Sequence, residues 1–449
     1  MSYSRGLYID WKWILLAGIF ISFALLFILL VFGGKVALAA FVGAVTVLAS
    51  FFVPETGLLL WALLVISEPF MTGYMNLGAG LNLTNIFLVL IITGYLLKCA
   101  VERKDIIPYS TLNVAISIVV FMAVLSFIRG SSYFGYSLTG EDLNQFKRFL
   151  TTFIVMFLSS NMFENKKAIF AFGLVVLATL LYETRVVFIE HSSVSHWHYS
   201  HAMRIKGTFE GGGGANELGE FLAHNCAMLF AFIINLKKKH WILIGIMLVF
   251  LILGIMALQY SYSRGAYLSF ILAVLAMSFL KSRKLFATVV IIGVLSYPLW
   301  PVSVRERFTS IKQEDKSIHT RKEIWKMARA HIAKSPIIGY GYNASSHMLP
   351  RDTHNMYYDI ALEMGIPALL ALWYLLLTMM LMGYRLYRAG PNFLYKSVGL
   401  ALLGSTITVS MGNMFGTRLG YFPINMHWAI LSGIGVVLYK KIKWPPKNS

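Results

Sequence analysis

The sequence of 449 residues is 57% hydrophobic and only 13% charged. Soluble globular proteins carry about 25% charged residues, so this composition excludes an ordinary soluble fold. The net charge of +19 does not indicate a nucleic-acid partner, because no soluble domain is left to bind one. Basic loops next to anionic membrane lipids account for that charge. Having only two cysteines, both in or beside apolar runs, excludes a disulfide framework and a cysteine-based metal site.

Apolar runs long enough to cross a membrane recur along the whole sequence. The hydrocarbon core of a bilayer needs about 20 apolar residues per helix. By this measure, the sequence predicts an all-α polytopic membrane protein with roughly 12–14 transmembrane helices. The candidate spans are 13–32, 36–53, 57–66, 85–100, 112–128, 146–162, 168–182, 217–236, 241–258, 262–280, 285–300, 358–384, 397–415 and 421–439.

Basic residues test these spans independently, because loops on the cytoplasmic side collect lysine and arginine. Such clusters occur in alternate loops of the predicted series, so hydropathy and charge predict one topology, with both termini in the cytoplasm. The clusters are Arg103 and Lys104; Lys166 and Lys167; Lys237, Lys238 and Lys239; Lys281, Arg283 and Lys284; Arg385 and Arg388; and Lys440, Lys441 and Lys443.

The predicted topology divides the chain into five segments. Loops held by a rigid scaffold are where function usually lies, so the two long external segments are the first places to look for a site. The segments are N-terminal transmembrane helices (1–184), a first long external loop (185–216), central transmembrane helices (217–301), a large external loop (302–357) and C-terminal transmembrane helices (358–449).

The large external loop contains the most informative polar motifs. Trp325, Ala328 and Ile332 recur at helical spacing, which predicts an amphipathic helix over residues 320–333 on the membrane surface. A proline soon afterwards ends this helix, and the glycines that follow allow a tight turn. His354 comes next, at the outer end of a membrane helix, where it faces water rather than lipid.

Arginines recur on the same external side. Arg264 stands at the outer mouth of a membrane helix, where a cation needs an anionic partner or a wet cavity. Arg204 lies in the first long loop, shortly before four consecutive glycines and Asn216. Arg321 lies on the amphipathic helix, and Arg418 lies in a short external turn. The sequence therefore predicts that these cations face one external cavity, together with the histidine of the large loop.

These residue types suit one kind of reaction. Planar, permanently charged guanidinium groups bind a phosphate or diphosphate through paired hydrogen bonds. They also stabilise the charge that develops on a diphosphate leaving group. A histidine, with an unperturbed pKa near ~6.5, accepts a proton from a hydroxyl as a general base. The combination predicts transfer of a group from a lipid diphosphate to an acceptor hydroxyl.

The order of these motifs resembles the O-antigen ligase and polymerase superfamily, the WaaL/Wzy-type bacterial membrane glycosyltransferases. The resemblance covers residues 204–366, and its motifs are short individually but occur in the right order. The motifs are Ser263-Arg264-Gly265, Arg321 with Trp325, Pro336 to Asn343, His354-Asn355, and Glu363-Met364-Gly365-Ile366.

The resemblance implies a GT-C-like helical fold in the bacterial inner membrane, with the active site on the periplasmic face. It also implies an undecaprenyl-diphosphate-linked glycan donor and inverting glycosyl transfer without a metal ion or other cofactor. The catalytic histidine maps to His354, and the two arginines that bind the diphosphate map to Arg264 and Arg321. We assign catalysis to His354 and Arg264, and substrate binding to Arg321, Arg204, Asn216, Asn355 and Arg418.

Two forms of this activity stay open. A ligase transfers the glycan to lipid A-core, and this is the leading hypothesis. A Wzy-type polymerase uses a second lipid-linked glycan as acceptor and has a chain-length regulator as a further partner. A polysaccharide or lipid transporter is the remote alternative, but it needs ionisable residues at mid-membrane, and the predicted spans are nearly free of charge.

Each candidate residue also has a simpler interpretation. Arg264 can place its charge at the membrane interface, Arg321 can solvate an external helix, and His354 can stand at the start of a helix. Four histidines between residues 191 and 201 fit no structural zinc pattern. We therefore expect a polar external loop there and no metal site.

Overall fold

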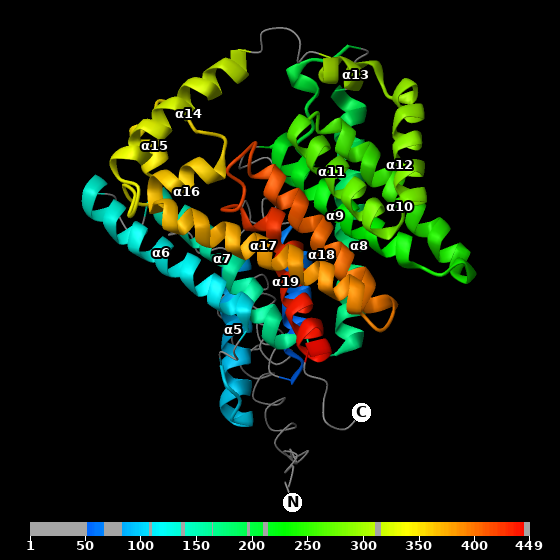
Figure 1. The fold of residues 1–449 in the computed structure, drawn as a ribbon, viewed down its shortest axis with the longest axis horizontal. Helices are drawn as coiled ribbons and strands as arrows, with labels where there is room; N and C mark the ends of the chain where they lie inside the picture. Colours follow the sequence, from blue (N-terminus) through cyan, green and yellow to red (C-terminus); the bar gives the residue numbers. More distant parts are fainter. Residues whose placement is uncertain are drawn as a thin grey trace, which may run out of the picture. The chain divides into compact units, whose positions relative to one another are not determined.

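A computed structural model describes most of the chain. The described residues are 52–66, 83–106, 110–135, 140–163, 165–194, 198–209, 214–309 and 316–443. Within them every regular element is a helix (Figure 1). Nine of these helices are long and apolar enough to cross a membrane. The prediction of an all-α polytopic membrane protein is therefore confirmed.

The nine candidate spans agree with nine of the predicted ones. They are α5 (Leu83–Glu102), α6 (Thr111–Phe134), α8 (Lys166–Val194), α9 (Ala215–Asn235), α10 (Trp241–Tyr260), α11 (Arg264–Lys281), α17 (Ile366–Ala389), α18 (Phe393–Gly412) and α19 (Phe422–Lys443). Three further predicted spans form α3 (Pro54–Val65), α7 (Glu141–Met162) and α12 (Arg283–Ser296), which are shorter or less apolar. The predicted spans 13–32 and 36–53 lie outside the described residues, except for the last two positions.

The chain forms two compact units, and the candidate site belongs to the second. Among the described residues the first unit comprises 52–61 and 83–106. There the indole N–H of Trp61 donates to the carbonyl of Thr84 at 2.9 Å. The second unit contains α6 and every later helix.

Three helices form the interior of the second unit. The apolar window of α19 is 94% buried within the protein, whereas that of α10 is only 22% buried. α9 and α18 pack on each other, and α19 packs on α7. Because a weakly buried span must face lipid, α10 lies at the edge of the bundle, whereas α9, α18 and α19 form its packed centre.

Short helices lie in the segments between the long helices. The first long loop contains the 3₁₀ helices η1 (His201–Met203) and η2 (Gly207–Phe209), and the other two 3₁₀ helices are η3 (Lys238–His240) and η4 (Tyr297–Leu299). The large loop (302–357) contains α13 (Val302–Thr309), α14 (Lys316–Lys334) and α15 (Ala344–Met348), and α16 (Met356–Met364) begins at its end. The structure thus contains the helix that was predicted over residues 320–333.

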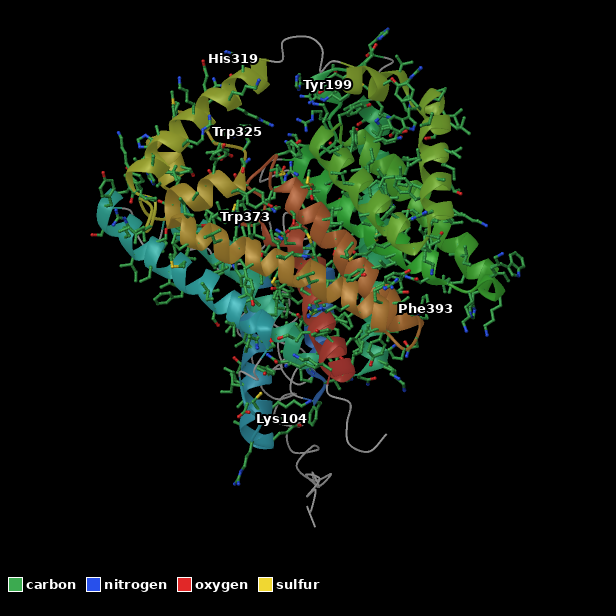
Figure 2. All side chains as sticks on the ribbon, viewed as in Figure 1. Lys104, Tyr199, His319, Trp325, Trp373 and Phe393 are labelled. Carbon is green, nitrogen blue, oxygen red and sulfur yellow. The ribbon has the colours of Figure 1, made fainter. Side chains whose placement is uncertain are left out.

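The amphipathic helix of the large loop is α14, and its apolar face packs on protein. Ile324 and Ala328 are buried together with Leu362 of α16. Trp325 also points from α14 toward α16 (Figure 2), and its indole N–H donates to the carbonyl of Thr353 at 2.8 Å. The apolar stripe of this helix is therefore used to hold α16, and its place at the membrane surface stays a prediction.

The predicted span 358–384 is interrupted at Gly365. This glycine has a φ of 88°, and a Cβ there would lie 2.1 Å from the carbonyl oxygen of Ile337. Only glycine tolerates this conformation and this close approach. The segment is therefore two helices, α16 and α17. Hydropathy cannot detect the break, because both sides of it are apolar.

Candidate functional site

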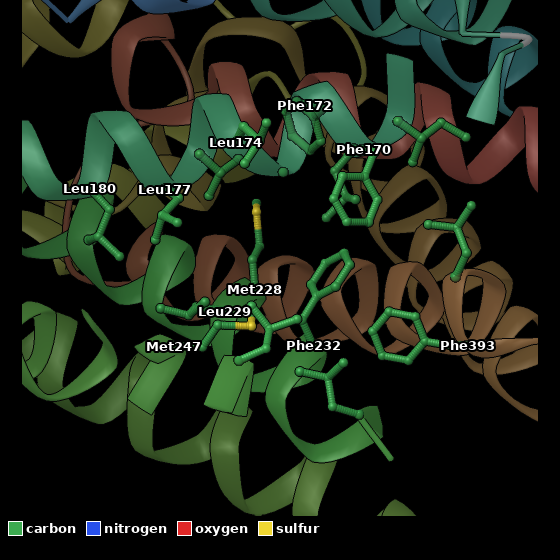
Figure 3. A pocket seen from close by; sticks show the side chains of 17 residues that line it. Phe170, Phe172, Leu174, Leu177, Leu180, Met228, Leu229, Phe232, Met247 and Phe393 are labelled. Atoms are coloured by element: carbon green, nitrogen blue, oxygen red, sulfur yellow. The ribbon is translucent and has the colours of Figure 1, made fainter. Parts of the chain in front are cut away.

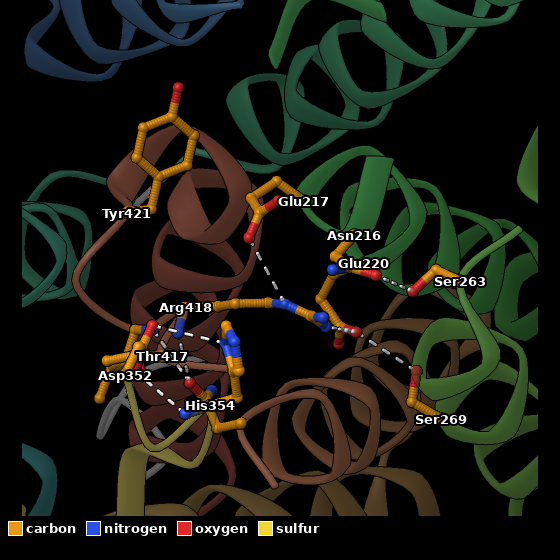
Figure 4. Close-up of polar contacts among 12 residues, drawn as sticks. Asn216, Glu217, Glu220, Ser263, Ser269, Asp352, His354, Thr417, Arg418 and Tyr421 are labelled. Atoms are coloured by element: carbon orange, nitrogen blue, oxygen red, sulfur yellow. Dashed lines mark hydrogen bonds and ion pairs between the residues drawn. The ribbon is translucent and has the colours of Figure 1, made fainter. Parts of the chain in front are cut away.

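His354 lies in a tight turn directly before α16. Its φ of 50° is a left-handed conformation that is uncommon for residues other than glycine. The backbone N–H of His354 donates to Asp352 Oδ1 at 2.9 Å, and Oδ2 of the same carboxylate lies 3.4 Å from His354 Nδ1 (Figure 4). The turn therefore places one ring nitrogen beside a carboxylate and directs Nε2 away from it.

Burial, together with nearby charges, lowers the pKa of His354. Burial lowers the pKa of His354, the carboxylate of Asp352 opposes this shift, and the charges of Arg321 and Arg418 lower the pKa further. At neutral pH the imidazole is therefore mainly neutral, which is the form that accepts a proton. Arg321 of α14 and Arg418 of the turn before α19 are therefore close enough to His354 for their charges to act on it.

Arg418 is buried in the turn between α18 and α19, with 2% of its surface exposed. Its Nη1 donates to Glu220 Oε2 at 3.0 Å, and its Nε lies 3.9 Å from Glu217 Oε1 (Figure 4). The side-chain oxygen of Asn413 accepts the backbone N–H groups of Arg418 and Leu419, which fixes the turn. A buried cation needs such partners, and the first two turns of α9 supply two carboxylates.

A hydrogen-bonded chain joins Arg204 to the start of α11. Arg204 Nη2 donates to Asn216 Oδ1 at 2.6 Å, and Ser263 Oγ donates to the same oxygen at 3.1 Å. Ser263 directly precedes Arg264, the first residue of α11. Burial lowers the pKa of Arg204, whose charge also interacts with those of Glu217 and Arg418. The start of α9 thus brings together the segments that carry two of the predicted arginines.

These contacts link five of the seven predicted residues into one connected region, and Arg264 follows Ser263 of the same region in sequence. The separate roles of these residues in catalysis and substrate binding stay predictions. The five are Arg204, Asn216, Arg321, His354 and Arg418.

Asn355, the seventh predicted residue, has a local structural task. Its Oδ1 accepts the N–H of Tyr357 at 3.0 Å and that of Tyr358 at 3.4 Å, so it caps the N-terminus of α16. Asparagine is among the preferred residues at this position. Its side chain is buried. It therefore orients the helix that follows His354, and its side-chain oxygen is engaged in the cap.

The acidic partners of the site were missed from the sequence. Glu217 and Glu220 pair with Arg418, and Asp352 contacts the histidine. One signal was available, because a carboxylate inside a membrane helix is costly and usually has a partner. Glu220 stands in the second turn of an apolar span and carries this signal. The pairing itself joins α9 to a turn near the C-terminus, which no local pattern encodes.

Ionisable groups also lie deeper in the bundle than the sequence indicated. His224 of α9 and His427 of α19 are fully buried. His427 Nδ1 lies 2.7 Å from Asn225 Oδ1, and Nε2 lies 3.4 Å from the hydroxyl of Thr179. The sequence predicted that the spans are nearly free of charge. That prediction left out these histidines, because a histidine is counted as neutral in the formal charge at pH 7.

The histidines of the first long loop have separate partners in the described residues. His191 stacks on Tyr260, with ring centroids 3.6 Å apart, and His198 Nδ1 lies 2.6 Å from Glu306 Oε1. His196 lies outside the described residues. Within the described part of the chain, no group of three or more His, Cys, Asp or Glu side chains is arranged to hold a metal ion.

An apolar cavity of about 150 Å³ lies between α8, α9, α10 and α18 (Figure 3). Aliphatic, aromatic and methionine side chains line it, including Phe172, Met228 and Phe232. Met228 lies about 18 Å beyond Asn216 along α9, at 1.5 Å per residue. The cavity is therefore separate from the polar region around His354, and its lining has no group suited to acid–base chemistry.

Comparison with known protein families supports the resemblance seen in the motifs. Residues 248–373 match the model of a family described as O-antigen ligase. The matched segment contains α11 and the large loop, and therefore Arg264, Arg321 and His354. The resemblance to the O-antigen ligase and polymerase superfamily is confirmed. A comparison with curated proteins finds no match.

Proposed function

Because the family match supports the O-antigen ligase and polymerase superfamily, we propose that the protein is a glycosyltransferase that moves a complete glycan from undecaprenyl diphosphate to a hydroxyl of lipid A-core. We propose that it acts at the periplasmic face of a bacterial inner membrane, by an inverting and metal-independent reaction. The observation that carries the proposal is the contact of His354 with Asp352, with Arg321 and Arg418 nearby.

His354 is suited to be the general base. The carboxylate of Asp352 beside Nδ1 favours the tautomer with its proton on Nδ1 and its lone pair on Nε2. Nε2 then takes the proton of the acceptor hydroxyl as the hydroxyl oxygen attacks the anomeric carbon of the donor. Asp352 stabilises the imidazolium that forms, in the way the acidic member of a catalytic triad does.

The arginines are suited to stabilise the leaving group. As the acceptor oxygen bonds to the anomeric carbon, the bond from that carbon to the diphosphate oxygen breaks. The oxygen keeps the electron pair, so undecaprenyl diphosphate gains one negative charge. In our proposal Arg264 and Arg321 bind this charge through paired N–H groups, and Arg204 with Asn216 extends the same anion site. Attack opposite the leaving group inverts the anomeric configuration.

We assign Arg418 a supporting electrostatic role. Its guanidinium already bonds Glu220 and lies near Glu217, and these partners hold it in a buried position. Its charge still acts on both His354 and Arg204. A fixed positive charge at this point favours an anionic donor without needing to touch it.

Transfer by the purified protein in proteoliposomes tests the proposal. The donor is undecaprenyl-diphosphate-linked glycan and the acceptor is lipid A-core. We expect lipid A-core carrying one complete glycan. A ladder of longer lipid-linked glycans would instead indicate the polymerase alternative. Movement of the donor across the bilayer without transfer would favour a transporter, for which His224 and His427 supply the buried ionisable groups.

The His354→Ala variant tests the base. General-base catalysis contributes about 10²–10⁴-fold, so we expect turnover to fall by at least ~100-fold. His319→Ala is the matched control, because His319 lies on α14 with 78% of its side chain exposed and pairs with Glu323 of the same helix. Turnover that survives His354→Ala, or that falls equally in the control, would contradict our assignment.

A further inference from the structure

One buried carboxylate joins two turns that are distant in sequence. Thr353 Oγ1 donates to Asp359 Oδ1 at 2.6 Å, and Thr417 Oγ1 donates to Asp359 Oδ2 at 2.7 Å (Thr417 is labelled in Figure 4). Thr353 and Asp359 are buried, with exposures of 0% and 3%. Each threonine directly precedes a residue of the candidate site, since Thr353 comes before His354 and Thr417 comes before Arg418.

Two further hydrogen bonds to backbone carbonyls hold the same two turns together. The N–H of Met356, at the start of α16, donates to the carbonyl of Asn413 at 3.0 Å. The hydroxyl of Tyr357 donates to the carbonyl of Ser410 at 2.7 Å. These bonds fix α16 against the end of α18. The Asp359 carboxylate then sets the position of the residues on either side of that contact.

From this geometry we infer that Asp359 is a positioning residue that fixes His354 relative to Arg418. The inference rests on the proposed function, because it concerns the placement of the proposed base against a cation of the same site. Both carboxylate oxygens are engaged, one with each turn. Loss of either contact therefore moves one turn relative to the other. Misplacement of catalytic groups by about 1 Å can cost ~10²-fold in rate.

The chemistry of the contact separates Asp359 from an ordinary buried acid. A hydrogen bond from a hydroxyl to a carboxyl oxygen is short and directional. Asp359 accepts two of them, at 2.6 and 2.7 Å, from threonines of two separate turns. Thr417 Oγ1 also lies 3.4 Å from Asp352 Oδ1, and Thr353 Oγ1 also bonds the backbone of Asn355, so both hydroxyls tie the two turns together. In the described part of the chain neither hydroxyl bonds the imidazole of His354, so an effect of Thr353 or Thr417 on His354 acts through the position of its turn.

Chemical modification of His354 tests the inference without requiring glycosyl transfer. The full-length protein in detergent is treated with diethyl pyrocarbonate at several pH values, and mass spectrometry measures the modified His354 peptide. We expect Asp359→Asn, Thr353→Val and Thr417→Val to change the rate at least about threefold or to move its pH midpoint. Thr408→Val is the control, because it removes a fully buried hydroxyl that bonds only within α18. Unchanged reactivity in all three variants would overturn the inference.

Kinetics of transfer then separate positioning from general damage. We expect kcat to fall at least about tenfold in Asp359→Asn and Thr353→Val with little change in KM, and Thr353→Ser to restore it. The double variant Asp359→Asn with Thr353→Val should have a kcat no lower than that of Asp359→Asn alone. Additive losses, or an equal loss in Thr408→Val, would overturn the inference. If the wild-type protein transfers no glycan, the proposed function fails, while the modification rates still decide whether Asp359 places His354.

Discussion

At the scale of single residues, the balance of charges around His354 determines the pH at which the site works. Burial and two arginines lower the pKa of His354, and Asp352 alone raises it. A general base must be deprotonated, so turnover is expected to rise with pH through this lowered pKa and to level off above it. The midpoint of this rise therefore lies below the ordinary histidine value of about 6.5.

The Asp352→Asn variant tests this balance. It removes the one charge that raises the pKa of His354, so the acidic limb of the kcat profile should move to lower pH. The plateau should also fall at least ~10-fold, because the amide no longer favours one tautomer or stabilises the imidazolium. Profiles of kcat against pH for both proteins measure the two effects. An acidic limb that stays in place, or moves to higher pH, would contradict the assigned contact.

Single residues also show which parts of the site can be predicted from sequence patterns. His354 and the external arginines could be identified, because basic side chains next to apolar spans stand out and have a recognisable chemistry. Their partners could not. Glu220 and Arg418 are separated by 198 positions, and only the packing of α9 on α18 and α19 brings them together. The contact of Asp352 with His354 is local, but it depends on a left-handed backbone that composition does not reveal.

At the scale of helices, the break between α16 and α17 orients the site. Gly365 is also the point where the chain meets the turn after α14, and the N–H of Ile366 donates to the carbonyl of Pro336 at 2.7 Å. An alanine at position 365 would require a strained φ and would force Ile337 to move. Because Asp359 and His354 are attached to α16, movement at this break reaches them directly.

We expect Gly365→Ala to lower the stability of the protein. The unfavourable backbone conformation alone costs on the order of 1–3 kcal/mol, and the contact with Ile337 adds to it. Gly173→Ala is the matched control, because a Cβ there meets nothing within 4 Å and the residue lies inside α8. Thermal unfolding in detergent compares the two variants. A melting temperature for Gly365→Ala equal to that of the control would contradict the role assigned to this glycine.

Helix-level prediction succeeded where periodicity and length were enough. The spans and the helix over residues 320–333 are present, because hydrophobic runs and helical spacing are local properties. The packing of that helix on α16 could not be predicted, since an apolar face has the same sequence pattern whether lipid or α16 covers it. Asn355 was assigned to substrate binding through its neighbour, although an asparagine before a helix is also a capping signal.

At the scale of the whole molecule, burial and hydropathy are opposed in two of the described spans, α10 and α19. The most apolar span, α10, is the least buried within the protein, whereas the less apolar α19 is almost fully buried. Lipid is as apolar as any core, so apolar helices gain nothing by moving inward, and the interior collects helices with polar side chains that can pair. α19 carries such groups, including His427 and Asn425, both hydrogen-bonded inside the second unit. Hydropathy therefore predicted the spans but not their order from edge to centre.

The proposed mechanism also requires the large loop to face the periplasm, as the basic clusters predict. The two cysteines of the chain, Cys99 and Cys226, are buried, so an introduced cysteine can be labelled against a low background. Ser346 of α15 and Lys238 of η3 are both exposed. We expect a membrane-impermeant maleimide to label Ser346→Cys in intact spheroplasts, and to label Lys238→Cys only after permeabilisation. The reverse pattern would place the candidate site in the cytoplasm, where the basic loops should be, and would contradict the proposed periplasmic transfer.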